Sequence, residues 1–226
     1  MPEYKSKTSI VIPFYNLNQY LDRCLRSCLN QRILSDIIVV DDASSEPPNI
    51  PEQDECLIRV IRNEKNQGLS ESRNNGAKIA QTEYILTLDP DDRLAPNTIA
   101  ELELPMDIDS RIGVVFMKMR MFGDRDGELV PPIIDRDITA KEWLETNRIY
   151  STSLIRKSAL EQVGYWRDIE IAEDWDLWIR LAMAGWKFKF CPSTFYFHHI
   201  RGDSKWEKDI AKYGEDYKQM IRDLNK

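Results

Sequence analysis

The chain has 226 residues, of which 42% are hydrophobic and 31% charged, and this composition excludes a disordered, collagenous or low-complexity protein. Its formal net charge of −7 argues against a nucleic-acid partner, because proteins that bind nucleic acid normally present a basic face. The four cysteines form no CxxC pair and there are only two histidines, which disfavours a disulfide scaffold and a Cys/His zinc site.

The N-terminal segment MPEYKSKTSIVIP lacks the long apolar core of a signal peptide. No stretch approaches the 18 apolar residues that a membrane-spanning helix needs, so we expect no membrane span. A reducing, cytoplasmic location fits these features best, and peripheral contact with the inner face of the membrane stays open.

The first half of the chain alternates short apolar strands with amphipathic helices. In chain order, the pattern predicts strand 9–12, helix 18–31, strand 36–42, strand 57–61, helix 70–80, strand 84–88 and a helix that opens at Pro96. The run of four apolar residues inside 36–42 is typical of a strand buried on both faces. Such alternation indicates βαβ units and a mostly parallel sheet flanked by helices.

The second half of the chain is less regular. It predicts strand 112–119, a loop or hairpin over 123–137, helices 139–147, 158–163 and 174–184, and a short strand 186–190. One apolar stripe from Trp206 to Leu224 predicts a single terminal helix that packs on the rest of the chain. A homodimer contact through that helix is the alternative. Because no long linker interrupts the pattern, we expect one domain over 1–226.

Acidic residues follow two of the predicted strands. Asp41 and Asp42 close the strand 36–42, and the run from Asp89 to Asp92 closes the strand 84–88. In open parallel sheets, ligands bind beyond the carboxyl ends of the strands. Clustered carboxylates there favour Mg²⁺ or Mn²⁺, which keep waters and bridge to substrate phosphates. The alternative is that these aspartates make turns or cap helices.

Several known phosphate and hydrolase motifs are missing. The chain has no GxGxxG after its first strand and no GxxxxGK[ST], which argues against dinucleotide dehydrogenases and P-loop enzymes. Neither GxSxG nor HExxH occurs, so esterase and zincin chemistry have no signature.

Four segments, 8–16, 36–44, 66–92 and 173–178, resemble family 2 glycosyltransferases of the GT-A fold. The resemblance implies an α/β protein in which a Rossmann-like half that binds the nucleotide-sugar, 1–104, is fused to a half that binds the acceptor, 105–226. It also implies an inverting transferase that uses Mn²⁺ or Mg²⁺ and a nucleotide-sugar donor, with UDP as the default. The acceptor would be a saccharide or glycolipid, in polysaccharide, lipopolysaccharide or glycoconjugate synthesis at the cell envelope.

The resemblance implies roles for five residues around the nucleotide. Pro13 and Tyr15 lie where the first strand meets the nucleotide, with the Tyr15 ring packed on uracil. Asp42 matches the aspartate that hydrogen-bonds the base. Gly68 and Arg73 line the nucleotide, and Arg73 is placed to reach the ribose or the phosphates.

The resemblance also implies the metal and catalytic residues. Asp89 and Asp91 match the DxD motif, with Asp91 ligating the metal and Asp89 holding the ribose or metal-bound waters. Asp174 matches the catalytic base. One of His198 and His199 matches a late histidine near the metal or the diphosphate, and His199 is favoured as the metal ligand.

A base at the N-terminal end of a helix is stabilised in its ionised form, so burial has to offset the helix dipole if Asp174 is to accept a proton near neutral pH. A double displacement would need a second carboxylate, and Glu173 and Asp176 stay open for that role. Two other classes remain. A sugar nucleotidyltransferase would have a Gly- and Arg-rich loop where this chain reads PFYNLNQ, and a nucleotide-sugar-binding module would have no catalytic acids.

Overall fold

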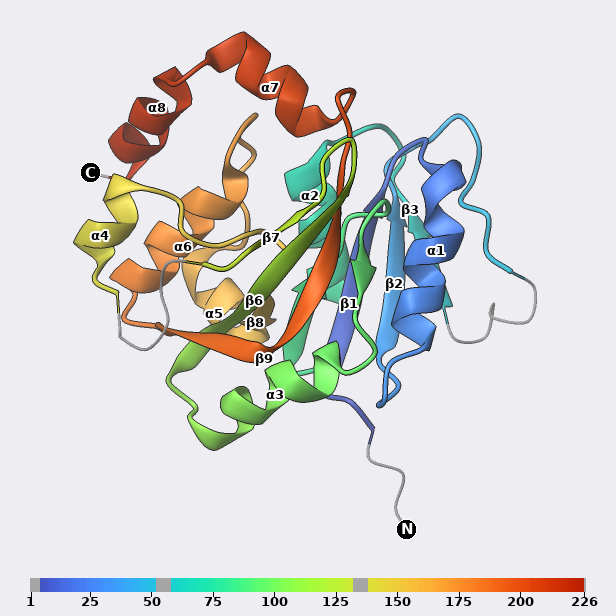
Figure 1. The fold of residues 1–226 in the computed structure, drawn as a ribbon, viewed down its shortest axis with the longest axis horizontal. Coiled ribbons are helices and arrows are strands. Elements are labelled where there is room, and N and C mark those ends of the chain that lie inside the picture. The colour runs from blue at the N-terminus through green and yellow to red at the C-terminus, as the bar shows by residue number, and fades with distance from the viewer. Residues whose placement is uncertain (1–4, 52–57, 132–137, 226) are drawn as a thin grey trace.

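The computed structural model describes residues 5–51, 58–131 and 138–225. A central sheet is covered by helices on both faces (Figure 1). The elements are, in chain order, β1 (Thr8–Phe14), α1 (Asn18–Leu29), β2 (Asp36–Asp41), β3 (Ile58–Arg62), α2 (Leu69–Ile79), β4 (Tyr84–Thr87), β5 (Arg93–Leu94), α3 (Thr98–Ile108), β6 (Ile112–Gly123), β7 (Gly127–Leu129), α4 (Ala140–Glu145), β8 (Leu154–Arg156), α5 (Lys157–Val163), α6 (Glu173–Met183), β9 (Lys187–Ile200), α7 (Lys205–Tyr213) and α8 (Asp216–Leu224).

The sheet is mixed rather than mostly parallel. Within the described residues its strand order is β3-β2-β1-β4-β8-β6-β9-β5, with β7 paired to β6. The strands β3, β2, β1 and β4 are parallel, as predicted, and so is the pair β6–β9. The short strands β8 and β5 run antiparallel to their neighbours, and neither was predicted. The α/β fold is therefore confirmed, with a sheet that is only partly parallel.

Alternate residues of β1 and β2 enter two separate hydrophobic cores, as expected of strands buried on both faces. Val11 and Ile38 belong to the core under α2, whereas Ile10 and Ile37 belong to the core under α1. A Cβ on Gly76 would lie 2.3 Å from a Val11 methyl, so only glycine lets α2 approach β1 so closely.

The predicted terminal helix is in fact two helices. They are separated at Gly214, whose combination of φ +54° with ψ −131° is readily adopted only by glycine. In α8, Tyr217 and Ile221 are buried against the helical core, whereas no residue of α7 is fully buried. Both helices lie at the end of the molecule opposite α3 (Figure 1). The predicted stripe is packed only in part, because Trp206, Met220 and Leu224 are exposed.

Part of the hairpin predicted over 123–137 is present, because β7 pairs with β6, while residues 132–137 lie outside the described residues. Thr139 begins α4 with a capping box, in which its hydroxyl and the side chain of Glu142 exchange hydrogen bonds with the backbone. No helix in the described part of the chain combines the length and the hydrophobicity that a membrane span requires.

Candidate active site

The loop between β3 and α2 is anchored by Asp42, at the carboxyl end of β2. One oxygen of its buried carboxylate accepts the backbone N–H of Gln67 and the side-chain amide of Asn63, both at 2.8 Å. The other oxygen accepts the Gly68 N–H at 2.9 Å, where φ is +87°. These contacts hold the glycine at the end of the sheet. The nucleotide contacts of Asp42 and Gly68 stay predictions.

The turn after β1 presents an aromatic ring to solvent. Asn16 has a left-handed backbone with φ of +53°, and its N–H donates to the Ser44 hydroxyl at 3.0 Å. Its side-chain oxygen accepts the Ser45 N–H at 2.9 Å. Pro13 is buried in β1, and Tyr15 beside the turn is 48% exposed, so its ring is accessible to a stacking partner.

Asp92 ties the end of β4 to β9. Its buried carboxylate lies 3.0 Å from Nδ1 of His198 and accepts the backbone N–H of His199 at 2.9 Å. Burial raises the pKa of Asp92 to about 6, against the lowering effect of His198. Burial by itself would lower the pKa of His198, but the Asp92 carboxylate overrides it and raises that pKa to about 9. Asp92 thus fits the turn-forming alternative rather than a metal ligand.

The Asp91 carboxylate is close to both negative and positive charge. Arg201, which follows the two histidines closely in the chain, donates its Nε–H to Asp91 at 2.8 Å. Its side chain is 13% exposed, so the guanidinium is paired with Asp91 and mostly shielded from solvent. Burial and the charge of Asp89 raise the pKa of Asp91, whereas Arg201 lowers it. Repulsion between Asp89 and Asp91 is the condition that a divalent cation relieves.

His199 is packed among aromatic rings rather than directed at the carboxylates. Its ring stacks on Phe122 with centroids 4.7 Å apart, and meets the Tyr20 ring edge-on at 5.1 Å. Its Nδ1 is buried without a hydrogen-bond partner, and burial lowers its pKa.

Among the described residues, no three His, Cys, Asp or Glu side chains are gathered into a metal site. Mg²⁺ and Mn²⁺ commonly take one or two carboxylates plus substrate phosphates, and Asp91 with Asp89 beside it fits that donor set. The metal-ligand role of His199 stays a prediction.

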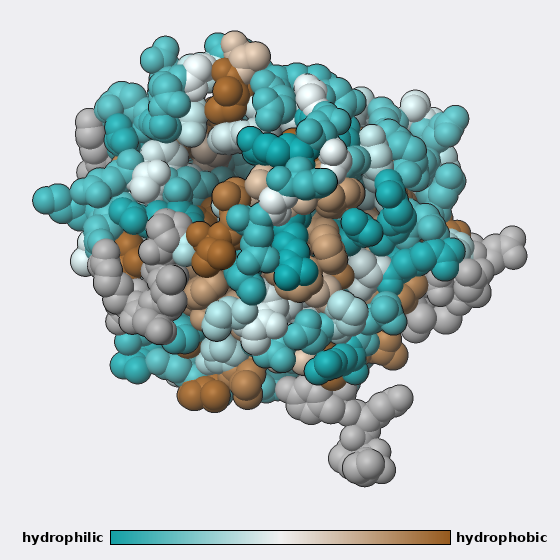
Figure 2. All heavy atoms as spheres, in the orientation of Figure 1, coloured by the Kyte–Doolittle hydropathy of each residue, from teal (hydrophilic) through white to brown (hydrophobic). Residues whose placement is uncertain are grey.

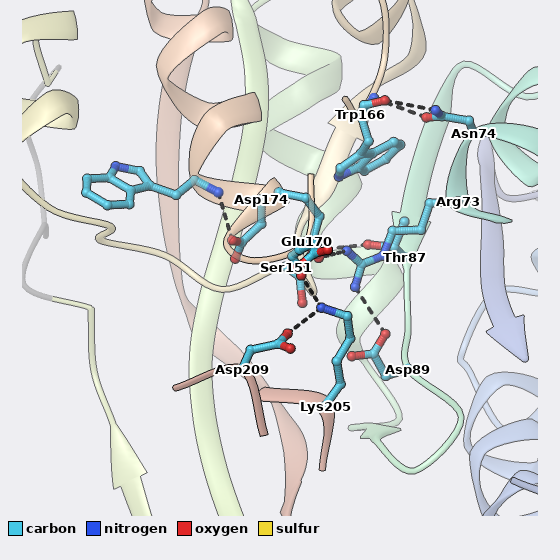
Figure 3. A network of polar contacts seen from close by, with 12 residues as sticks. Arg73, Asn74, Thr87, Asp89, Ser151, Trp166, Glu170, Asp174, Lys205 and Asp209 are labelled. Atoms are coloured by element: carbon cyan, nitrogen blue, oxygen red, sulfur yellow. Dashed lines mark hydrogen bonds and ion pairs between the residues drawn. The ribbon is translucent and has the colours of Figure 1, made fainter. Parts of the chain in front are cut away.

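Arg73 connects the two acidic segments. Its buried guanidinium donates Nη1 to Glu173 at 2.5 Å and Nη2 to Asp89 at 3.2 Å (Figure 3 shows the Asp89 pair). Asp89 follows β4 and Glu173 begins α6, so this arginine of α2 joins the end of β4 to the start of α6. The resemblance predicted that Arg73 reaches the ribose or the phosphates. In the structure its partners are these two carboxylates, and a nucleotide contact stays a prediction.

Asp174 lies in the first turn of α6, after Ala172 with its left-handed φ of +59°. Its Oδ1 accepts the Trp175 N–H at 2.7 Å, and the Asn147 amide lies 3.4 Å from both oxygens. Burial, and then the charge of Glu173, raise the pKa of Asp174 to about 7, while Arg73 lowers it. Burial and Glu173 therefore outweigh the lowering by Arg73 and by the hydrogen bonds from Trp175 and Asn147, and a pKa shifted in this way is common at functional sites.

Asp176 is fully buried and structural. Its oxygens accept hydrogen bonds from Arg167 at 3.0 Å, Arg180 at 2.8 Å and Asn225 at 3.0 Å. Three donors on a fully buried carboxylate leave it no access to a substrate, which removes it from a double displacement. Glu173 is held by Arg73, so it too is engaged by the protein.

Sequence reasoning missed Lys205, at the start of α7. Its ammonium group contacts the Glu170 carbonyl and the Asp209 carboxylate. In the view of Figure 3 it projects between the carboxylates of Asp174 and Asp89. Nothing local in the sequence marked it, because it stands in a helix of mixed charge.

Comparison with known proteins identifies the family. The family model for glycosyl transferase family 2 matches residues 9–164, and the one for glycosyl transferase family group 2 matches residues 150–225. An uncharacterized glycosyltransferase of Haemophilus influenzae is 28% identical over 76% of this chain and 61% of its own length. Chondroitin synthase of Escherichia coli is 27% identical over 95% of this chain and 32% of its own length. The chain thus spans 61% and 32% of the length of these two relatives.

Solved structures show the same fold. Staphylococcus aureus TarS, in a complex with UDP, superposes with a TM-score of 0.74 at 20% identity, covering 96% of this chain and 70% of that one. The mannosyltransferase PcManGT of Pyrobaculum calidifontis, in a complex with GDP-Man and Mn²⁺, also gives 0.74, at 16% identity, covering all of this chain and 66% of that one. The fold is of the GT-A type. The chain belongs to glycosyl transferase family 2.

Proposed function

We propose that this chain is a metal-dependent inverting glycosyltransferase, which moves a sugar from a nucleotide-sugar to a hydroxyl acceptor with 1–226 acting as one domain. The observation that carries the proposal is Asp174. Its pKa of about 7 suits a general base, and the contacts from Glu173 through Arg73 to Asp89 link it to the acids after β4.

In this proposal Asp174 accepts the proton of the acceptor hydroxyl as that oxygen attacks the anomeric carbon. Oδ1 is occupied by the Trp175 N–H, whereas Oδ2 has only the long contact with Asn147 and is the oxygen available for the proton. One base and one in-line attack give inversion. With Asp176 saturated by three donors, the structure favours this route over a double displacement.

Asp91 would hold Mn²⁺ or Mg²⁺ jointly with the donor diphosphate, with Asp89 on the ribose or on metal-bound water. When bound, the ion would stabilise the negative charge of the departing diphosphate. Arg201, already paired with Asp91, places a second positive charge at the same position. The His199 ring is packed against Phe122 and Tyr20. It would contact the metal or the diphosphate through Nδ1, which has no hydrogen-bond partner, or through Nε2.

We propose that the donor is a UDP-sugar. Tyr15 would pack on the uracil ring, and Pro13, Asp42 and Gly68 would surround it. The support is the resemblance of the fold to TarS, which was solved with UDP. Because the mannosyltransferase was solved with GDP-Man, GDP-sugars are the second class of donor to test. Relatives named chondroitin synthase, hyaluronan synthase and a teichoic acid biosynthesis protein favour a saccharide or glycolipid acceptor in envelope polysaccharide synthesis. The cytoplasmic location, peripheral membrane contact and homodimer stay predictions.

A panel of UDP-, GDP- and dTDP-sugars, with and without Mn²⁺, tests the proposal. We expect thermal stabilisation by one nucleotide class and, with that donor, slow hydrolysis or transfer that needs the metal. Release of pyrophosphate from a sugar phosphate and a nucleoside triphosphate would instead identify a nucleotidyltransferase. Binding without any turnover across an acceptor panel would identify a binding module.

Replacing Asp91 by asparagine should weaken the affinity for UDP in the presence of Mn²⁺ by at least about tenfold, because one charged ligand is lost. Calorimetric titration with and without Mn²⁺ measures the effect. Asp203→Asn is the matched control, since Asp203 contacts the same Arg201 at 2.6 Å but is 74% exposed. Equal UDP affinity of wild type and Asp91→Asn would remove Asp91 from the metal site.

The rate should depend on pH through Asp174. A base must be ionised, so kcat/KM should rise with pH and level off above about 7, the pKa raised by burial and by Glu173. Glu173→Gln removes the neighbouring negative charge and should move the profile to lower pH. A profile that is flat from pH 5 to 9, or a shift of the Glu173→Gln profile to higher pH, would contradict this.

A further inference from the structure

A pocket of about 280 Å³ lies between α1 and the edge formed by β5 and β9, apart from the carboxylate cluster. Three arginines line it, Arg23 and Arg26 from α1 and Arg93 from β5, together with Asn30 and Phe197. No acidic residue is among the lining residues in the described part of the chain. Strongly hydrophilic side chains gather over α1 on the face drawn in Figure 2. In a chain of net charge −7, this concentration of positive charge is unusual.

Arg93 is held in place by two aromatic rings, and its Nε–H has no hydrogen-bond acceptor. Its guanidinium lies over the Phe122 ring at 4.4 Å and over the Phe197 ring at 4.9 Å, and its Nε is buried without a hydrogen-bond partner. A buried N–H without a partner is costly, and an anionic oxygen would relieve it. In the described residues no carboxylate pairs with Arg23 or Arg93, while Arg26 pairs with exposed Asp22 at 2.9 Å.

The two walls of the pocket are fixed relative to each other. The Ser27 hydroxyl donates to the Cys24 carbonyl at 2.7 Å and accepts the Leu94 N–H at 3.0 Å, which ties α1 to β5. The two walls and the Arg93 side chain are therefore preformed, whereas the exposed side chains of Arg23 and Arg26 must still be ordered when a ligand binds.

Guanidinium groups bind phosphate and carboxylate oxygens by paired hydrogen bonds, and aromatic rings such as Phe197 pack on the apolar faces of sugar rings. We propose that this pocket binds a saccharide unit that carries a phosphate or a carboxylate. Phe122 lies under Arg93 and also stacks on His199, so one aromatic layer separates the pocket from the Asp91 region. The unit would be a distal part of an acidic acceptor, and that role, unlike the binding itself, rests on the proposed function.

Binding is tested by titrating glucose 6-phosphate, glucuronate, glucose and inorganic phosphate into the protein, with arginine Nε–Hε NMR signals as the readout. We expect the Arg93 signal to move with the two charged sugars, and not with glucose. Arg23→Gln, a change at an exposed residue, should weaken that binding roughly tenfold by loss of a charge-assisted contact, as should Arg93→Gln. Arg59→Gln, on β3 at the opposite end of the strand order, is the matched control and should bind as wild type does.

The tighter of the two charged sugars identifies the anion. An unmoved Arg93 signal, or undiminished binding by Arg23→Gln, would overturn the site. Inorganic phosphate bound more tightly than either sugar would overturn its saccharide character. Arginine-dependent binding to phosphatidylglycerol vesicles without binding to the charged sugars would also overturn it, in favour of a membrane contact. UDP titrations on the same variants should be unchanged. If the wild type binds no nucleotide but its Arg93 signal still moves with the charged sugars, the proposed function is contradicted and the proposed binding site is not.

Discussion

Asp174→Asn should lower kcat by about 10²–10⁴-fold while leaving the affinity for UDP and Mn²⁺ within about twofold. Asparagine keeps the shape of the side chain and still offers an oxygen to the Trp175 N–H, but it cannot accept the acceptor's proton. The proposed donor site keeps its own carboxylates, Asp89 and Asp91, because Arg73 stands between Asp89 and Glu173. Single-turnover assays, together with UDP titration, separate the loss of chemistry from a loss of binding.

Asp168→Asn is the control for that experiment, because Asp168 is an exposed acid in the loop before α6. It should retain wild-type turnover. If Asp174→Asn retained near-normal turnover as well, another group would have to take the proton. A fall in UDP affinity parallel to the fall in turnover would instead mean that Asp174 supports the donor site.

Arg73→Met should lower the free energy of unfolding by about 3–5 kcal/mol, the range found when one partner of a buried ion pair is removed. The side chain of Arg73 is 2% exposed and that of Glu173 is 11% exposed, so the substitution leaves a buried carboxylate without its cation. Asp89 is 30% exposed and is expected to contribute less. Urea or guanidinium denaturation measures the change. Because Arg73 lowers the pKa of Asp174, its loss should also move the kcat/KM profile to higher pH.

The double variant Arg73→Met/Glu173→Gln distinguishes this explanation from a general packing defect. Removing the unpaired negative charge of Glu173 should restore a part of the lost stability, because the neutral amide of glutamine is less costly to bury. A single variant within about 1 kcal/mol of wild type would show that the bridge between Asp89 and Glu173 is not a structural requirement. A double variant less stable than Arg73→Met alone would point to packing.

The elements that the sequence predicts well are those whose pattern is local. β1, β2 and α2 lie within two residues of their predicted bounds, because continuous apolar runs and helical periodicity are properties of short windows. β5 and β8 have two and three residues, too few to show any periodicity. β9 runs ten residues beyond its predicted end at Phe190, because the register with β6 shifts after Cys191 and passes over the following proline.

The same division holds in the candidate site. The convergence of acids at the ends of β2 and β4 follows from parallel strands, which place their carboxyl ends at one edge of the sheet. The contact between Arg73 and Glu173 joins residues 100 positions apart, and it depends on how α2 and α6 lie against the sheet. The pairing of Asp91 with Arg201 spans 110 positions. No local pattern encodes such partners, so the sequence predicted the acids, and Arg73 as a nucleotide contact, but not the ion pairs between them.

The position of β9 also affects when the protein can fold during translation. Among the strands that the structure describes it is the latest in the chain, yet it occupies a place between β6 and β5. Within the described residues the short β5 pairs only with β9, so it has no strand beside it until β9 has been synthesised. The nascent β3-β2-β1-β4 unit can assemble early from neighbouring segments, while the rest of the sheet must wait. Such a high contact order favours slow completion of folding and a long exposure of the unpaired edge of β6 to chaperones or to aggregation.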